Sequence, residues 1–290
     1  MLPLSTRESL LADVVCPICH ERVTLATTGD ADLRCSGCSR EYGRRGTPWI
    51  DLWPRKEWSW SSARWGDRQE QTNAAYRELI AHPDHARLAY RLDFEPYRTW
   101  LAHFRGRVLD VGGGNGLLRH VLPRPTEYVC VDPSPAWLDD SWLAIADAYP
   151  CLREPLAYVT GVGEHLPFPN RSFDGAVSFW CLNHVSKPAS VVREVARVLR
   201  PGAPFLLVLD DIPPTWRDIA TGAYRDGRYS SRGELIAAKL ASTFRGWPLQ
   251  EDHIPLSERM LRSWTLPALA WEDRSFVGSY YTAMLRKRKE

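Results

Sequence analysis

Short apolar runs and a segment of helical spacing follow one another between about residues 107 and 209. Residues 107–111, 128–131 and 205–209 are rich in valine and leucine, and each run has the length of a buried strand. Residues 187–199 carry apolar side chains at helical spacing, and Arg200-Pro201-Gly202 ends that helix. Alternation of strands and helices predicts an α/β protein. We expect a mainly parallel sheet of seven strands with helices on both faces.

A glycine-rich turn follows the first of these strands directly. Residues 112–116 are GGGNG, and a helical segment, residues 117–122, comes next. Glycine lets the backbone turn tightly and approach a ligand closely, while a helix N-terminus offers unpaired N–H groups. The second strand ends in Asp132-Pro133-Ser134, where a carboxylate can accept hydrogen bonds from both hydroxyls of a ribose. These features indicate either a nicotinamide dinucleotide or S-adenosylmethionine as the cofactor.

The segment from Gly161 to Ser178 separates these two cofactors. It is GVGEHLPFPNRSFDGAVS, and it resembles the segment GDAExLPFPDxSFDxVxS of class I S-adenosylmethionine-dependent methyltransferases with a methyltransferase-11-like domain. With the glycine turn, the resemblance covers about residues 105–211. It implies a Rossmann-like fold in which this loop borders the adenine ring. The family often has an acidic residue where this chain has Val162, so the adenine amino group is left to the backbone, to Glu164 or to water.

The resemblance also implies which residues surround the cofactor, because ligands of open α/β sheets lie beyond the carboxyl ends of the strands. These are Asp110, Gly112, Gly113, Gly114, Asn115, Asp132, Pro133, Val162, Gly163, Glu164 and Phe179.

In this family Phe173-Asp174 opens the fourth strand, and the methyl group would then point toward the end of that strand. Since the leaving group is already cationic, the protein adds positioning and removal of the acceptor's proton. His184 is the first candidate for the catalytic base, with Asp211 and the more distant His253 as further candidates. The alternative for His184 is a structural role in closing the site.

The N-terminal part carries two CxxC pairs, Cys16 with Cys19 and Cys35 with Cys38. Four thiolates at this spacing suit a structural Zn²⁺ site, whereas unmetallated dithiols or a redox site are the alternative. Residues 22–25 and 33–34 flank a polar stretch and predict a small antiparallel ribbon.

The pattern around these cysteines resembles the zinc ribbon of some bacterial ribosomal-RNA guanine methyltransferases, and also small zinc-ribbon activators of other methyltransferases. The resemblance rests on the two CxxC pairs and on Tyr42, Gly46, Pro48, Ile50 and Leu52. In the ribosomal enzymes the second ligand pair is commonly Cys and His, whereas here it is Cys35 and Cys38. An RNA substrate is therefore the alternative and not the main expectation.

The chain is expected to divide into a zinc ribbon, residues 1–53, a linker or lid, residues 54–85, and a methyltransferase domain, residues 86–290. The link carries Trp58, Trp60 and Trp65, which either cover the substrate cleft or join the two domains. An aromatic-rich insert at about residues 212–266 would contact the substrate. Residues 275–285 predict the antiparallel strand of this fold.

Composition narrows the function further. The formal net charge of +2 lacks the strong positive field of proteins that grip nucleic acid, so it favours a small molecule over RNA. There is no apolar stretch of ~20 residues and no secretory signal, so we expect a cytoplasmic protein with no membrane partner. The expected function is methyl transfer from S-adenosylmethionine to a small-molecule acceptor, for example in a biosynthetic pathway. The alternatives are an RNA methyltransferase and a cofactor-binding scaffold without turnover.

Overall fold

The computed structural model describes residues 1–54, 66–210, 212, 216–217, 224–225, 256–277 and 280–289, with only the backbone for residues 66–72 and 224–225. Several predictions fall outside these ranges. They concern the three tryptophans of the link, the candidate bases Asp211 and His253, and most of the 212–266 insert.

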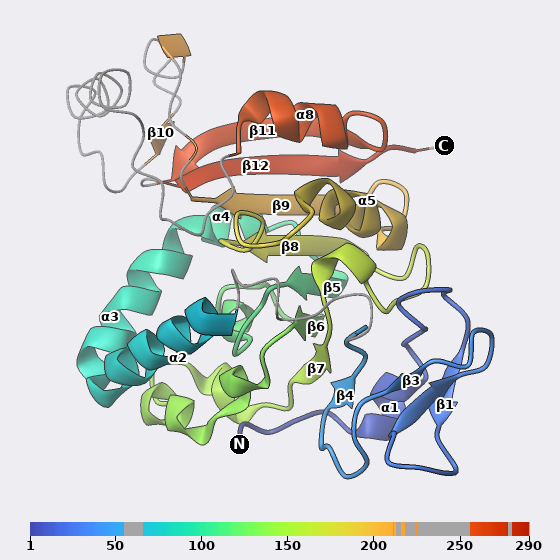
Figure 1. The fold of residues 1–290 in the computed structure, drawn as a ribbon. Helices are drawn as coiled ribbons and strands as arrows, with labels where there is room; N and C mark the ends of the chain where they lie inside the picture. The colour runs from blue at the N-terminus through green and yellow to red at the C-terminus, as the bar shows by residue number, and fades with distance from the viewer. Residues whose placement is uncertain are drawn as a thin grey trace.

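A nine-stranded sheet forms the centre of the fold, in the order β10-β11-β12-β9-β8-β5-β6-β7-β4 (Figure 1). Seven of these strands, from β11 to β7, form the predicted sheet, in which β12 is antiparallel to β9 and β11. The short strands β4 and β10 extend it at its two edges, each parallel to its neighbour. The strands are β4 (Ile50–Asp51), β5 (Gly106–Val111), β6 (Thr126–Asp132), β7 (Ala157–Thr160), β8 (Gly175–Phe179), β9 (Pro204–Leu209), β10 (Tyr224–Arg225), β11 (Leu269–Val277) and β12 (Tyr280–Lys287).

The prediction of one strand over residues 275–285 is wrong in its bounds. The chain reverses between Val277 and Tyr280, whose Cα atoms face each other as the last pair of β11 and β12. Both strands are rich in apolar and aromatic residues at this point, so they read as one apolar run interrupted by just Gly278 and Ser279.

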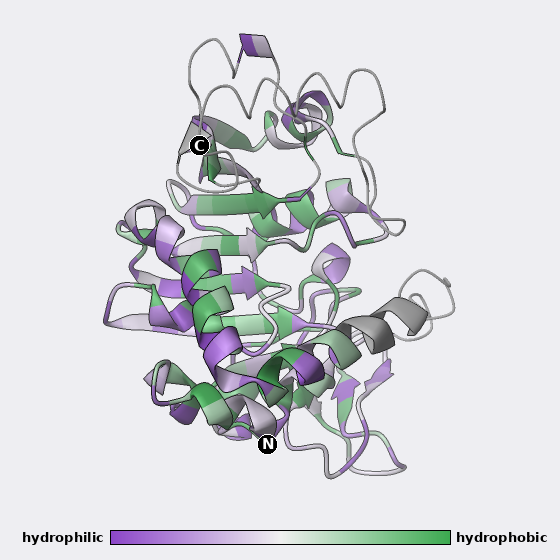
Figure 2. Cartoon of the chain, turned by 90° about the vertical axis from the view of Figure 1, so that its left-hand side faces the viewer, coloured by the Kyte–Doolittle hydropathy of each residue, from purple (hydrophilic) through white to green (hydrophobic). Residues whose placement is uncertain are grey.

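Apolar side chains alternate between the two faces of the sheet, because successive residues of a strand point to opposite sides. Leu109, Val129 and Leu207 belong to one buried cluster, and Val108, Cys130 and Val208 to another. Both faces are therefore covered, and Figure 2 shows the apolar colour concentrated on the central strands.

The helices supply that cover. α5 (Pro188–Val198) and α8 (Glu258–Thr265) pack on the first face, and η1 (Glu95–Tyr97), α4 (Arg98–Leu101) and the 3₁₀ helix η2 (Leu117–His120) on the second. The others are α1 (Arg7–Leu11), α2 (Gly66–Ala81), α3 (Pro83–Phe94), η3 (Pro135–Leu138), η4 (Asp140–Ile145), η5 (Pro150–Arg153) and η6 (Gly163–His165).

Two predicted helices fared differently. α5 confirms the prediction for residues 187–199, and Val191, Val192 and Val195 are buried as their spacing requires. The helical segment after the glycine turn is shorter than predicted and is a single 3₁₀ helix. Pro123 explains this, since proline disfavours helical backbone at the residue before it.

The N-terminal ribbon is a three-stranded antiparallel sheet of β1 (Val23–Leu25), β2 (Leu33–Cys35) and β3 (Glu41–Tyr42). This confirms the predicted ribbon. Its apolar residues, including Leu33, belong to the same buried cluster as Leu166 and Phe168 of the large sheet's first face. Through β4 the chain leaves the ribbon and joins the large sheet beside β7. The division at residues 53 and 85 stays a prediction, but the two parts share one core.

Among the described residues, no helix is long and apolar enough to cross a membrane.

Candidate functional site

Four neighbouring parallel strands, β7, β6, β5 and β8, end at the same edge of the sheet, and the residues after them meet there. The backbone N–H of Gly112 donates to the carbonyl of Val131 at 2.8 Å. The N–H of Gly114 donates to Oδ2 of Asp132 at 3.2 Å. The glycine turn is therefore held against the end of β6, as the predicted cofactor site requires.

Asp110 and Asp132 are buried carboxylates on either side of this turn. The Tyr128 hydroxyl donates to Oδ2 of Asp110 at 2.6 Å, while Oδ1 has no partner among the described residues. Asp132 accepts from the backbone N–H groups of Gly114 and Ser134. Burial nevertheless raises the pKa of both carboxyls to about 7. Each carboxylate would therefore gain from a ligand that supplies positive charge or hydrogen-bond donors.

Glycine is required in the turn by backbone geometry and by space. Gly112 has a φ of +75°, in the left-handed region that side chains disfavour. A Cβ atom on Gly113 would lie 2.7 Å from Cγ of Asp110 and 2.8 Å from the Tyr128 hydroxyl oxygen. A Cβ on Gly114 would lie 3.3 Å from the Trp137 ring. The absence of side chains thus lets the backbone of the turn pack directly beside the two carboxylates.

Further buried polar atoms at this edge lack partners among the described residues. They are the amide nitrogen of Asn115, the hydroxyl of Thr160 at the end of β7 and the hydroxyl of Ser178 near the end of β8. Buried polar groups normally have hydrogen-bond partners. A polar ligand at the carboxyl edge would satisfy them, so the residues present fit a nucleoside-type cofactor.

The loop after β7 lines the same edge. Val162 is buried, and a Cβ on Gly163 would lie 3.0 Å from a methyl of Val111. The carboxylate of Glu164 accepts from the backbone N–H of Lys187 at 3.1 Å, at the start of α5. Burial raises the pKa of Glu164. Glu164 thus holds the loop against α5 and has at least one oxygen engaged there.

An aromatic wall stands where β8 ends. The rings of Phe94 and Tyr280 lie 5.6 and 5.1 Å from that of Trp180, and the ring of Tyr97 lies 4.9 Å from that of Phe179. Trp180 has a φ of +50°, a strained conformation for a bulky residue. Its backbone N–H donates to the carbonyl of Val208, and its indole N–H is buried without a described partner.

Of the candidate bases predicted from sequence, His184 follows the wall residue Trp180 in the chain. His184 is half-buried, and its backbone N–H donates to the carbonyl of Cys181 at 2.9 Å. Asn183 is fully buried and donates to the carbonyl of Asp210 at 3.1 Å, which ties the end of β8 to the end of β9. Asp211 lies outside the described residues, so its role as a base stays a prediction.

Sequence reasoning missed one acidic residue near this wall, Asp93 at the end of α3. Burial raises its pKa to about 6. Burial, and then the charges of Asp93, Asp210 and Asp132, raise the pKa of Tyr76 on α2 to about 12. Tyr76 therefore lies within electrostatic reach of carboxylates from three separate elements. No local motif marks Asp93, because α3 precedes the recognisable part of the chain.

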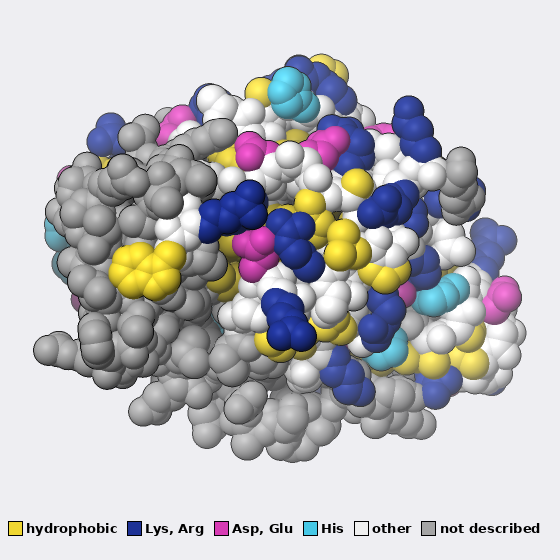
Figure 3. Space-filling view, turned by 90° about the horizontal axis from the view of Figure 1, so that it is seen from above, with side chains coloured by type: hydrophobic (Ala, Val, Ile, Leu, Met, Phe, Trp, Pro, Cys, Tyr) yellow, Lys and Arg dark blue, Asp and Glu magenta, His cyan; other side chains and the backbone are white. Residues whose placement is uncertain are grey.

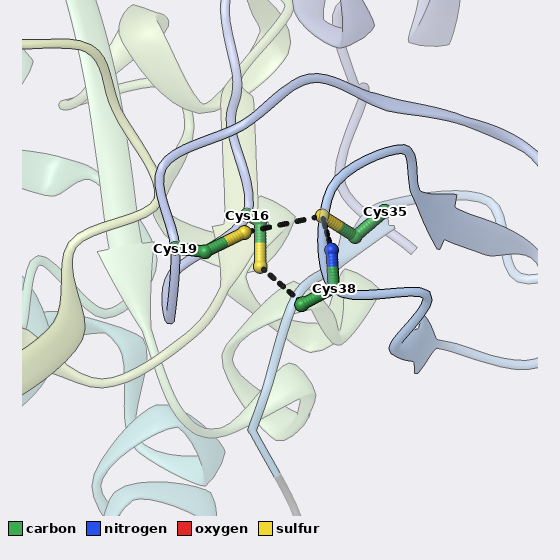
Figure 4. Close-up of side chains that lie close together, drawn as sticks. All are labelled: Cys16, Cys19, Cys35 and Cys38. Carbon is green, nitrogen blue, oxygen red and sulfur yellow. Dashed lines mark hydrogen bonds between the residues drawn. The ribbon is translucent and has the colours of Figure 1, made fainter.

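The second candidate site is the cysteine cluster of the ribbon, where Cys16, Cys19, Cys35 and Cys38 converge from two loops (Figure 4). Their sulfur atoms all lie within 4.8 Å of one another. The Cys16–Cys38 and Cys19–Cys35 sulfur pairs are 3.7 and 3.3 Å apart. A tetrahedral zinc–thiolate site has sulfur atoms about 3.8 Å apart, since its Zn–S bonds are about 2.3 Å. The cluster fits a zinc ribbon.

The electrostatics of the cluster also suit a metal. Burial raises the pKa of Cys16, Cys19 and Cys35. Burial acts in the same direction on Cys38, but hydrogen bonds led by the backbone N–H of Arg40 outweigh it and lower the pKa of Cys38 to about 6. The backbone N–H groups of Gly37 and Cys38 also point at the Cys35 sulfur. Amides directed at sulfur stabilise the thiolate form that metals bind.

Comparison with known proteins agrees with the geometry. A family model described as a methyltransferase domain matches residues 109–207. The chain is 29% identical over 187 residues to the ubiquinone biosynthesis O-methyltransferase of Xanthomonas oryzae pv. oryzae, covering 59% of this chain and 73% of that protein. It is 30% identical over 157 residues to the ubiquinone/menaquinone biosynthesis C-methyltransferase of Vibrio vulnificus, covering 50% and 59%.

A solved structure shows the same fold. It is a putative S-adenosylmethionine-dependent methyltransferase from Methanococcus maripaludis, with a TM-score of 0.50 and 16% identity, covering 76% of this chain and 94% of that one.

Proposed function

We propose that this chain, which is an S-adenosylmethionine-dependent methyltransferase of class I, transfers the methyl group to a small-molecule acceptor. The observation that carries this proposal is the aromatic wall at the end of β8, in which the partly buried rings of Phe94, Trp180 and Tyr280 pack on the buried core ring of Tyr97. Aromatic walls with a few polar groups are typical of sites for flat or apolar small molecules. The two relatives named above are called ubiquinone and menaquinone biosynthesis enzymes, which supports an acceptor of this kind.

We assign the cofactor to the carboxyl edge around the glycine turn. Asp132 would accept hydrogen bonds from the ribose hydroxyls, and the loop around Val162 would border the adenine ring. The unpartnered Oδ1 of Asp110 and the amide nitrogen of Asn115, whose oxygen accepts from the backbone N–H of Leu117, would bind the polar groups at the other end of the molecule. When bound, S-adenosylmethionine supplies a methyl group on a cationic sulfur that departs as a neutral thioether. The protein's own residues must then orient the acceptor and remove its proton.

For that proton we favour Asp93 over His184. The helix that carries Asp93 places the adjacent residue, Phe94, against Trp180 at 5.6 Å between ring centroids. A carboxyl whose pKa is about 6 is mostly ionised at neutral pH and is still basic enough to accept a proton. His184 stays a prediction for closing the site.

Asp93→Asn should lower the turnover number by about 10²-fold, the usual contribution of a general base, and should leave the affinity for S-adenosylhomocysteine unchanged. The rate of the wild type should also fall below pH ~6, and this fall should vanish in the variant. Asp84→Asn is the matched control, since Asp84 is an exposed carboxylate on the same helix, paired with Arg87. Equal turnover in Asp93→Asn and wild type would remove Asp93 from the mechanism.

The substrate class itself is tested with methyl-labelled S-adenosylmethionine and two fractions of a cell extract, small metabolites and RNA. We expect label in the metabolite fraction. The RNA alternative would need a basic surface, and Figure 3 shows Lys and Arg side chains on the face near α8 and β11. In this part of the chain, however, Arg274 and Arg286 are paired with Glu258 and Glu272. Label in RNA, with binding that weakens steeply as salt rises, would support the RNA alternative and reject the proposal.

We also propose that the four cysteines bind one Zn²⁺ for structural purposes, because four thiolates leave no open position. The purified chain should hold one zinc ion by elemental analysis. Cys19→Ser should lose it and lower the melting temperature by roughly 5 °C or more. Cys151→Ser, a buried thiol outside the ribbon, should retain the zinc. Full zinc content in Cys19→Ser would refute the assignment.

A further inference from the structure

The segment Leu166–Phe168, which follows the cofactor-side loop, is held by α5 through its backbone. Arg197 donates to the carbonyls of Leu166 and Phe168 at 2.9 and 2.8 Å. Glu194 accepts from the backbone N–H of Leu166 at 2.9 Å and pairs with Arg197 at 2.7 Å. All of these bonds involve backbone atoms of the segment, whose Leu166 and Phe168 side chains are buried in the core of the first face.

The ribbon holds the same segment from the other side. The backbone N–H of Val15 donates to the carbonyl of Pro167 at 2.9 Å. The imidazole Nε2 of His20 lies 4.0 Å from Oε2 of Glu194, the atom that also accepts from Leu166. Val15 immediately precedes Cys16, and His20 immediately follows Cys19. The residues on either side of the first cysteine pair therefore contact either this segment or Glu194, which binds it.

The segment continues directly into the cofactor side of the sheet. Just before it, Glu164 is bound to the backbone of Lys187 at the start of α5. Gly163 packs closely against Val111 at the end of β5. Earlier in the chain, the carbonyl of Thr160 at the end of β7 accepts at 2.8 Å from the backbone N–H of Leu52. Leu52 directly follows β4, the strand through which the chain leaves the ribbon. A displacement of the ribbon would thus be transmitted to residues 160–168 at two points, Thr160 and Pro167.

We infer that metal binding by the four cysteines and cofactor binding at the carboxyl edge are positively coupled, through the segment Leu166–Phe168 that the ribbon and α5 hold between them. The inference rests on the proposed metal and cofactor sites. Without the metal, the turn from Cys16 to Cys19 loses its cross-link, and Val15 and His20 lose their fixed positions. Residues 160–168 are then held by α5 without the ribbon, and the free energy needed to order them on binding lowers the affinity for the cofactor. By linkage, the cofactor must tighten metal binding by the same factor.

The test is calorimetric titration of S-adenosylhomocysteine into zinc-loaded protein and into chelator-stripped protein. We expect the dissociation constant to rise by about 5–150-fold on stripping, with one binding site per chain retained. Zinc competition against a chromogenic chelator should show the reciprocal gain when S-adenosylhomocysteine is present. A fall in the number of sites without a change in affinity would indicate unfolding and overturn the inference.

The possible results distinguish failure of the coupling from failure of the cofactor site or of the metal site. Equal affinity for S-adenosylhomocysteine with and without zinc overturns the coupling and leaves both sites standing. A loaded chain that does not bind S-adenosylhomocysteine overturns the cofactor site, and a chain that takes up no zinc overturns the metal site. The coupling falls with either of them.

Arg197→Met identifies the route. It removes the two bonds to the segment, together with the bonds of Arg197 to Asn170 and Glu194, and it alters neither the cysteines nor the proposed cofactor residues. The affinity of its loaded form for S-adenosylhomocysteine should fall toward the stripped value, while its zinc affinity without ligand stays unchanged. Arg193→Met on the same helix is the control, because Arg193 bonds to Ser190 of its own helix and, among the described residues, not to the segment. Should Arg197→Met fold poorly, Glu194→Gln keeps the acceptor for Leu166 and should give a partial effect. Unchanged coupling in both variants overturns the route.

Discussion

Gly112→Ala should weaken binding of S-adenosylhomocysteine by at least ~30-fold, because it combines backbone strain with overpacking, each of which costs about 1–3 kcal/mol. The φ of Gly112 is +75°, and an added Cβ would lie 2.5 Å from the sulfur and 2.7 Å from the Cβ of Cys181. Neither atom of Cys181 can move freely, since Cys181 follows Trp180 in the loop after β8. The turn would have to shift, and its amides would leave their places beside Asp110 and Asp132.

Gly29→Ala is the control for backbone strain outside the cofactor site, in the loop between β1 and β2 of the ribbon. Gly29 has a nearly equal φ of +76°, but a Cβ there meets no atom within 4 Å. This variant should bind S-adenosylhomocysteine as the wild type does, while Cys181→Gly in the Gly112→Ala background should recover part of the lost affinity. Wild-type affinity in Gly112→Ala, measured by calorimetry, would show that the turn does not contact the cofactor.

The affinity for S-adenosylhomocysteine should rise with pH between about 6 and 8. Burial raises the pKa of Asp132 to about 7, against the hydrogen bonds from Ser134 and Gly114 that lower it. Burial also raises the pKa of Asp110 to about 7, with the Tyr128 hydrogen bond opposing and the charge of Asp132 adding to the shift. A cofactor that donates hydrogen bonds to these groups binds their ionised forms. Binding below pH 7 must therefore release protons.

The same shifts predict the stability of the ligand-free protein. Both folded-state pKa values lie above the ordinary value of 3.8, so the protonated carboxyls stabilise the fold fully below pH ~4. That contribution is lost as the pH rises through about 7. Stability of the free chain and affinity for the cofactor thus change in opposite directions with pH.

Titrations at pH 6, 7 and 8 in two buffers of different ionisation enthalpy measure the effect. Below pH 7 the affinity should change by up to about tenfold per pH unit for each proton released. Asp132→Asn should bind weakly and with a flatter pH dependence. Proton uptake on binding, or an affinity independent of pH in the wild type, would contradict the assignment of these two carboxyls to the cofactor.

How much the sequence predicted depended on how local each feature is. The strands β5, β6 and β9 and the helix α5 followed from apolar runs, and the candidates Asp110 and Asp132 came from a motif in which residues near in sequence are also near in space. The 3₁₀ helix after the glycine turn was missed because residues 117–122 read as helical, whereas Pro123 disfavours helical backbone just before it. The reversal after Val277 was missed because apolar residues continue on both sides of it.

The missed features of the site depend on contacts between distant elements. The bond from Tyr128 to Asp110 requires the register of β5 against β6, in which Tyr128 faces Val108 and Asp110 faces Cys130. Asp93 joins the site only because α3 packs Phe94 against the end of β8. The bond from Glu164 to Lys187 likewise depends on where α5 begins. A single sequence contains no local signal for such packing.

The most direct test of this account is a calorimetric titration of the purified, zinc-loaded chain with S-adenosylmethionine, with S-adenosylhomocysteine and, as a control, with NADH. The account predicts that both sulfur compounds bind once per chain and that NADH does not bind. Binding of NADH without binding of the sulfur compounds would make the glycine turn a dinucleotide site and would contradict the central claim.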